Sequence, residues 1–174
     1  NKEMANIMIA KVKDATIHKA VIIDENKSIY EAATIIKKEK VPTILLKDNN
    51  NEMFIITDSD FRQKVILNRM DFDDKVIKIA TKGLIYVNED DFLFNAQLTM
   101  AKHGLKRVVV QNDKKEIVGI LDQISLSSFF ATNTFSVSNQ IVKAETLEEL
   151  KEASLSFIKI IKSLNAKGVK IEFI

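Results

Sequence analysis

Short apolar runs recur along this chain in two sets, and the second set follows the first at an offset of 64 residues. In each set, one apolar run precedes a stretch with helical spacing, and two further runs follow it, separated by a polar turn. The runs are Val21–Ile23, Ile44–Leu46 and Phe54–Ile56, and then Ile85–Val87, Val108–Val110 and Val118–Leu121. This pattern predicts two copies of a strand–helix–strand–strand–helix unit that pack against each other.

The helical stretches support the duplication, because residues 28–36 align with residues 92–100. In the first copy, Ser28 is suited to cap the helix and Glu31 lies three residues later, which is the spacing of a capping box. We expect Pro42 to end this helix, since proline cannot continue a helical hydrogen-bond ladder.

The predicted fold class is α/β, or more narrowly α+β, with two βαββα repeats related by pseudo-twofold symmetry, a C-terminal helix and a short strand. The expected boundaries are a lead-in helix at 1–11, repeat 1 at 12–68, repeat 2 at 75–131 and a C-terminal helical extension toward a missing domain at 132–174. Because the first residue is not Met and the last six alternate like a strand, we expect a fragment of a longer protein.

The tail has a pattern of its own. Thr146 and Glu149 form a second capping-box spacing, a heptad-like apolar series runs from Leu147 to Leu164, and Lys167-Gly168 is a helix stop. A helix with such an apolar face must pack against another part of its own chain or against another chain. Docking onto its own repeats, pairing with another chain and leading into a further domain all remain open.

Composition narrows the functional classes. Hydrophobic residues make up 46% and charged residues 29%, and 26 basic and 24 acidic residues leave a net charge of +2. This balance favours neither nucleic acid nor an anionic membrane as a partner. No apolar stretch approaches the roughly 20 residues that span a bilayer, and the absence of Cys fits a cytoplasmic location. The two histidines have no ligand cluster beside them, so we predict no metal and no required cofactor.

The candidate site lies where the third apolar run of repeat 1 meets a helix. Thr57 stands at this junction, where unpaired amides and a hydroxyl suit a phosphate, and the Asp60 carboxylate one turn later suits a ribose diol. The same Thr-x-x-Asp spacing also forms a capping box that needs no ligand, and spacing alone favours the cap over the ligand site.

Repeat 2 has different chemistry at the matching positions. Gly119 begins the motif, Asp122 replaces Thr57, and Ser125 replaces Asp60. A carboxylate at the junction would cap the helix but repel a phosphate, and Ser125 is too short to hold a diol. We therefore expect a degenerate second site.

These features resemble the CBS domain, and the duplicated unit resembles a tandem CBS pair, or Bateman module, over residues of about 10–131. The resemblance rests on the segment Ile55–Arg62, which holds the Thr-x-x-Asp motif, and on the helix pairs Ala32/Ile36 and Ala96/Met100. The sequences of this motif and of the tail are similar to those of bacterial signal-transduction proteins in which a nucleotidyltransferase region follows the CBS pair.

The resemblance implies a regulatory module, not an enzyme, that binds AMP, ADP, ATP or S-adenosylmethionine in the cleft between its repeats. Thr57 would meet the phosphate, Asp60 the ribose, and Ile55 with Ile79 and Ala80 the base. The module would form a homodimer through its helices and bias a neighbouring domain. Phe54 stands where the family has a small Gly, which narrows the site. A ligand-free dimerisation scaffold and a truncated part of an enzyme are the alternatives.

Overall fold

The structure is a computed structural model of the 174-residue chain and describes residues 9–142, 146–148, 151 and 155. Most of the predicted lead-in helix lies outside the described residues, as do Glu149, most of the heptad series, the Lys167-Gly168 stop and the short terminal strand. One compact unit consists of His18–Val87 and Val108–Ile120. The other contains η1 (Val12–Asp14), α4 (Leu93–His103) and α5 (Gln123–Val142).

Repeat 1 is built on a three-stranded sheet of order β1-β2-β3. Its strands are β1 (Ile22–Asp24), β2 (Thr43–Lys47) and β3 (Met53–Thr57). Strands β1 and β2 are parallel because helix α2 (Ile29–Glu39) connects them, whereas β2 and β3 form an antiparallel hairpin. The strand–helix–strand–strand order that the periodicity predicts is therefore confirmed.

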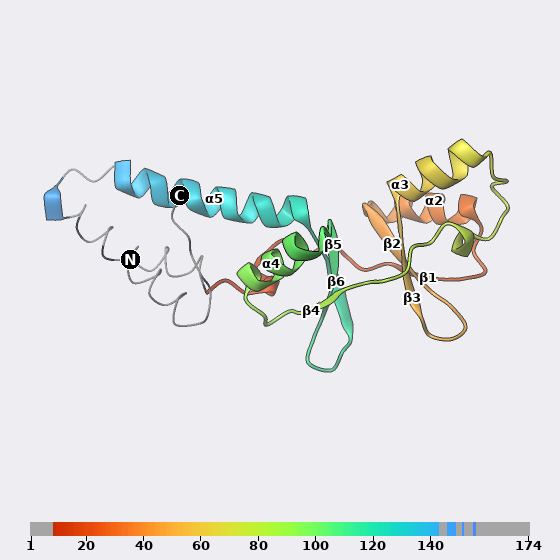
Figure 1. The fold of residues 1–174 in the computed structure, drawn as a ribbon, viewed down its shortest axis with the longest axis horizontal. Helices are drawn as coiled ribbons and strands as arrows, with labels where there is room; N and C mark the ends of the chain where they lie inside the picture. The colour runs from red at the N-terminus through yellow and green to blue at the C-terminus, as the bar shows by residue number, and fades with distance from the viewer. Residues whose placement is uncertain (1–8, 143–145, 149–150, 152–154, 156–174) are drawn as a thin grey trace. The chain divides into compact units, whose positions relative to one another are not determined.

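A second helical segment follows β3 without a break. It consists of α3 (Asp58–Asp60), the π-helical turn η2 (Phe61–Ile66) and two further helical residues. This segment and α2 lie on the same side of the sheet (Figure 1). Side chains from all three elements meet in one core that includes Ile29, Ala32, Ile44, Ile56 and Val65.

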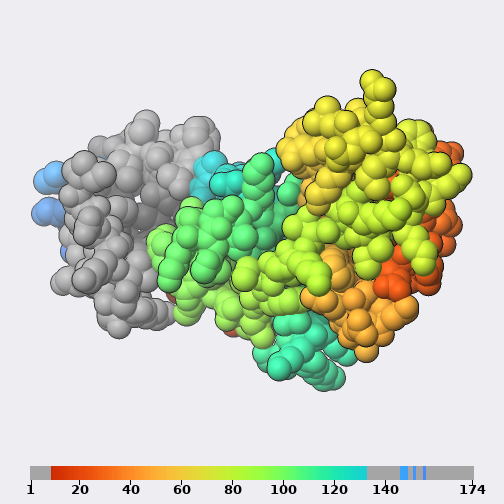
Figure 2. All heavy atoms as spheres, turned by 45° about the vertical axis from the view of Figure 1, so that its right-hand side comes forward, coloured from red at the N-terminus to blue at the C-terminus, as the bar shows by residue number. Residues whose placement is uncertain are grey.

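Residues beyond the repeat 1 boundary complete this core. The short helix η3 (Val76–Lys78) contributes Val76, and the following Ile79 is fully buried in the same cluster. Figure 2 shows residues 58–80, in yellow to yellow-green, as one continuous surface. The segment after η3 also pairs with the edge of β3, because the amide N and carbonyl O of Ile55 and Thr81 exchange two hydrogen bonds of 2.9 Å.

Repeat 2 reproduces the same order of elements. Its strands, in sheet order, are β4 (Tyr86–Asn88), β5 (Arg107–Gln111) and β6 (Ile117–Asp122), with helix α4 (Leu93–His103) between the first two. Helix α5 follows β6 directly and runs from Gln123 to Val142, past the expected end of repeat 2 at residue 131. Among the described residues, no helix is long and apolar enough to cross a membrane.

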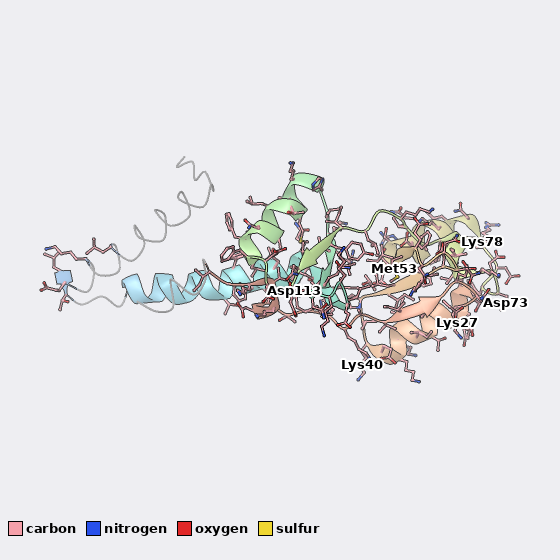
Figure 3. All side chains as sticks on the ribbon, turned by 90° about the horizontal axis from the view of Figure 1, so that it is seen from below. Lys27, Lys40, Met53, Asp73, Lys78 and Asp113 are labelled. Atoms are coloured by element: carbon pink, nitrogen blue, oxygen red, sulfur yellow. The ribbon has the colours of Figure 1, made fainter. Side chains whose placement is uncertain are left out.

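The helix ends differ from the prediction in one respect. Helix α2 ends at Glu39, and Lys40 caps it in the left-handed conformation, with φ of 54° and its amide donating to the Ile36 carbonyl. Pro42 therefore lies two residues beyond the cap and does not itself end the helix. The exposed Lys40 side chain is labelled in Figure 3 at the end of α2.

Candidate functional site

Strand parity fixes which side chains can reach the candidate site. Along β3, Phe54 and Ile56 point into the core beneath the helices, whereas Ile55 points to the opposite face and packs near Leu45 and Val109. Phe54 is 4% exposed within that core. The aromatic ring that was expected to narrow the site therefore lies on the other face of the sheet from Ile55.

Thr57 and Asp60 form a closed local unit. The Thr57 amide donates to Asp60 Oδ2 at 2.9 Å, and the Thr57 hydroxyl donates to the same oxygen at 3.2 Å. This is the capping interaction that the Thr-x-x-Asp spacing also predicts: a carboxylate three residues into the helix satisfies the amide at its start. The cap and the candidate ligand site are thus made of the same atoms.

The second oxygen of Asp60 is equally engaged. Oδ1 accepts a hydrogen bond from the Thr81 hydroxyl at 3.1 Å and lies 2.8 Å from Lys64 Nζ. Asp60 is only 7% exposed, so this carboxylate is buried with its partners. Asp60 therefore ties the motif of repeat 1 to the segment that pairs with the edge of β3.

Sequence reasoning missed Lys64 and Thr81. Lys64 lies four residues after Asp60, which is a spacing that brings opposite charges together on a helix, and this signal was available in the sequence. Thr81 is brought in by its pairing with Ile55, a contact between distant segments that spacing does not reveal.

The structure changes the roles expected of Ile79 and Ala80. The Ile79 side chain is fully buried in the core of repeat 1, and Ala80 packs against the same core. Ile79 reaches the site through its backbone, because its carbonyl accepts a hydrogen bond from Lys64 Nζ at 2.7 Å. Of the three apolar residues expected to surround a base, Ile55 alone packs on the face that Thr57 shares by strand parity.

A buried hydroxyl lies on the strand next to the site. Thr43 is 1% exposed and stands directly opposite Thr57 in the β2–β3 pairing, so both side chains point to the same face. Within the described residues, Thr43 Oγ1 has no hydrogen-bond partner. Because an unpaired buried hydroxyl costs free energy, Thr43 marks this face as suited to a polar ligand.

At the matching junction in repeat 2, the positions of the capping carboxylate and the donating amide are exchanged. The Ser125 amide donates to Asp122 Oδ1 at 2.7 Å, so the carboxylate at the start of α5 satisfies an amide inside the helix. Gly119 is buried in β6, and Ser125 is half-buried. Among the described residues, the structure holds no group of three or more His, Asp or Glu side chains that could bind a metal ion.

The comparisons with known proteins agree with this architecture. Residues 76–131 match the model of the CBS domain. The carnitine transport ATP-binding protein OpuCA of Listeria monocytogenes is 30% identical over 131 residues, which are 72% of this chain and 32% of that protein. L-aspartate semialdehyde sulfurtransferase of Methanocaldococcus jannaschii is 28% identical over 131 residues, which are 75% of this chain and 25% of that protein.

Two solved structures share the fold. The CBS domain pair of protein MJ0100, in complex with 5′-methylthioadenosine and S-adenosyl-L-methionine, has a TM-score of 0.60 and 26% identity, covering 71% of this chain and 98% of that one. A CBS domain protein from Pyrobaculum aerophilum complexed with AMP has a TM-score of 0.60 and 24% identity, covering 72% of this chain and 98% of that one.

A CBS domain pair is supported by both the family model and the structural neighbours. The predicted fold class is confirmed, with mixed α/β structure and two CBS repeats of strand–helix–strand–strand order. The chain spans about a third of the length of the first curated relatives that it matches.

Proposed function

We propose that this CBS pair is a regulatory module that binds an adenosine-containing ligand at the Thr57–Asp60 site of repeat 1. The observation that carries the proposal is the buried Asp60 carboxylate at a strand–helix junction, with the Thr57 hydroxyl beside it and the unpartnered Thr43 hydroxyl on the neighbouring strand. The adenosyl ligands of the MJ0100 pair, which is 26% identical, support the same ligand class.

The residues would divide the ligand between them. The Asp60 carboxylate would accept hydrogen bonds from the two ribose hydroxyls, and Thr57 with the first amides of residues 58–68 would face a phosphate. Ile55 offers an apolar contact for the base. The module itself carries out no reaction in this proposal, and ligand binding shifts the population of conformations that a neighbouring domain senses.

The direct test is isothermal titration calorimetry of AMP, ATP and S-adenosylmethionine against the chain. We expect one ligand per chain, and Asp60→Asn should weaken binding by about 10- to 100-fold, because a hydrogen bond to a charged group is worth roughly 1.5–3 kcal/mol. Asn keeps an acceptor for the Thr57 amide, so the variant should fold. Ser125→Ala, at the matching position of repeat 2, is the control and should bind as the parent chain does.

The alternative is a dimerisation scaffold that binds no ligand, and one observation favours it. An apolar pocket of about 220 Å³ opens on the helical face of repeat 1, lined by Ile29, Tyr30, Ala33, Phe61, Val65, Ile66 and Phe72. Several of these side chains are exposed, including Tyr30 at 65% and Ile66 at 66%. Such a surface suits a homodimer through the helices.

Ultracentrifugation combined with the titration separates the two functions. A dimer that forms with or without nucleotide, together with no heat from any of the three ligands, would establish the scaffold and remove the sensor. The bacterial signalling context, the cytoplasmic location and a nucleotidyltransferase as the neighbouring domain stay predictions. Sequencing the gene beyond the codon for Ile174 tests the last of these.

A further inference from the structure

Lys64 holds the carboxylate that the proposed ligand would need. Its ammonium nitrogen lies 2.8 Å from Asp60 Oδ1, 2.7 Å from the Ile79 carbonyl oxygen and 3.2 Å from the Thr81 hydroxyl oxygen. Three oxygen acceptors therefore surround one ammonium group. A lysine held in this way is an internal counter-ion of Asp60 rather than a solvated surface charge.

The carboxylate of Asp60 has no acceptor capacity left in this arrangement. A carboxylate offers about four lone-pair positions, two on each oxygen. Oδ2 accepts from the amide and hydroxyl of Thr57, and Oδ1 accepts from Thr81 and is bound to Lys64. A ribose diol, which brings two donors, can therefore bind Asp60 only if two of these partners turn away.

Two side-chain partners can turn away from Asp60: the Thr57 hydroxyl, which the proposed function directs at a phosphate, and the Lys64 ammonium. The Thr57 amide belongs to the backbone at the end of β3, and the Thr81 backbone is fixed by two hydrogen bonds to Ile55. The Lys64 side chain is 39% exposed, against 9% for Asp60, and its four-carbon stem can rotate into solvent. Ligand entry would then exchange the Lys64 ammonium and the Thr57 hydroxyl for the two ribose hydroxyl donors.

We propose that Lys64 is a displaceable counter-ion that competes with the ribose for Asp60 and selects adenosine ligands that carry an anionic group. This inference rests on the proposed function. The displaced ammonium loses its anionic partner, and a phosphate on the same ligand replaces it. Neutral adenosine offers no such group, and S-adenosylmethionine, with a sulfonium, an ammonium and one carboxylate, has a net positive charge that opposes the ammonium. The ligand class is therefore an adenine nucleotide.

A matched ion pair elsewhere in the chain supplies the control. Lys78 and Asp74 have the same four-residue spacing and the same 2.8 Å distance between Nζ and Oδ1, but the Asp74 side chain is 33% exposed. Figure 3 labels Lys78 within the segment that follows Asp73. Lys78→Met thus removes one positive charge and one ion pair of the same spacing and distance, and it leaves the partners of Asp60 unchanged.

The experiment is calorimetric titration of adenosine, AMP and S-adenosylmethionine against the parent chain, Lys64→Met, Lys64→Arg and Lys78→Met. Lys64→Met should bind adenosine about fivefold more tightly than the parent chain, since a half-exposed ion pair no longer has to break. The preference for AMP over adenosine should shrink by a similar factor. Lys64→Arg and Lys78→Met should retain the parent preferences.

Each outcome decides between the two proposals. If the parent chain and Lys64→Met bind adenosine equally well and show the same preference for AMP, the counter-ion role is wrong and the nucleotide site stands. If neither protein binds any of the three ligands, both the site and the role of Lys64 are wrong. If only Lys64→Met binds, the lysine closes the site in the parent chain, which supports the proposal in its strongest form.

Discussion

The two repeats solve the same structural problem with carboxylates placed at opposite ends of the motif. In repeat 1, the amide of Thr57 at the junction donates to Asp60 within the helix, whereas in repeat 2 the amide of Ser125 within the helix donates to Asp122 at the junction. Either arrangement supplies a hydrogen-bond acceptor to a backbone amide at the start of a helix. Folding therefore does not require a carboxylate at position 60, and its placement there needs a further reason.

That reason lies in what surrounds each carboxylate. Asp60 is 7% exposed and is bound to Lys64 and Thr81, which come from later parts of the chain. Ser125, the counterpart of Asp60, is half-buried and carries no charge. Repeat 1 therefore places a partly buried ion pair where repeat 2 has a neutral side chain, as expected if only repeat 1 holds a ligand site.

The largest expected effect comes from deleting this carboxylate. Asp60→Ala removes an acceptor from the Thr57 amide and leaves the Lys64 ammonium without its anionic partner. We expect a loss of about 2–3 kcal/mol in the free energy of unfolding, below the 3–5 kcal/mol seen for fully buried pairs because Lys64 is partly exposed. Urea denaturation followed by circular dichroism measures it.

Ser125→Ala is the matched deletion in repeat 2 and should cost less than Asp60→Ala, because it removes no charge and retains the Ser125 amide that donates to Asp122. Equal losses in the free energy of unfolding for Asp60→Ala and Ser125→Ala would contradict the difference between the repeats. Asp60 would then act only as a helix cap.

A smaller effect is expected at the C-terminal ends of the first helices. Lys40 ends α2 with φ of 54°, and Gly104 ends α4 with φ of 61°. A left-handed residue with a Cβ costs about 1 kcal/mol relative to Gly. A Cβ at Gly104 would meet no atom within 4 Å, so conformation alone decides the cost.

We therefore expect Lys40→Gly to raise the free energy of unfolding by about 0.5–1 kcal/mol, and Gly104→Ala to lower it by about 1 kcal/mol. Thermal and urea unfolding of both variants measure the two changes. A stabilising Gly104→Ala, or a neutral Lys40→Gly, would show that the two helix ends are not equivalent in energy.

Local sequence patterns predicted the fold well because its elements depend on short-range physics. The alternation of β3 and the Ser28–Glu31 capping box are both visible in the sequence and are found in the structure. The left-handed cap at Lys40 was missed because lysine gives no sign of this conformation. The candidate site was harder to predict, since Thr81 reaches Asp60 through a pairing between segments more than 20 residues apart.

Phe54 and Ile79 are two further residues whose roles the sequence did not predict. Their identities suggested contact with a ligand, but strand parity directs Phe54 into the core, and burial leaves Ile79 only its carbonyl for the site. Which face a side chain takes is decided by the packing of α2 and residues 58–68 on the sheet. Composition and spacing at the motif do not contain that information.

The smallest predicted effect concerns the N-terminal ends of the same two helices. In α2, the Ser28 amide donates to Glu31 at 2.8 Å. This backbone hydrogen bond, together with a side-chain hydrogen bond from the Lys27 ammonium, lowers the pKa of Glu31 below its ordinary value of 4.5. At the matching place, α4 begins after Phe92, whose side chain forms no cap, and Asn95 has no carboxylate.

A carboxylate whose pKa is lowered by folding stabilises the protein above the unfolded pKa, and this contribution is lost as the pH falls through the folded value. Glu31 therefore stabilises the chain fully above about pH 4.5 and progressively less below it. Glu31→Gln should remove this dependence and flatten the acid side of a plot of unfolding midpoint against pH between 6 and 3. Asn95→Gln, at the matching position of α4, should leave the slope unchanged. If Glu31→Gln keeps the parent slope, the acid sensitivity arises from other carboxylates, and the two helix starts are equivalent in their response to pH.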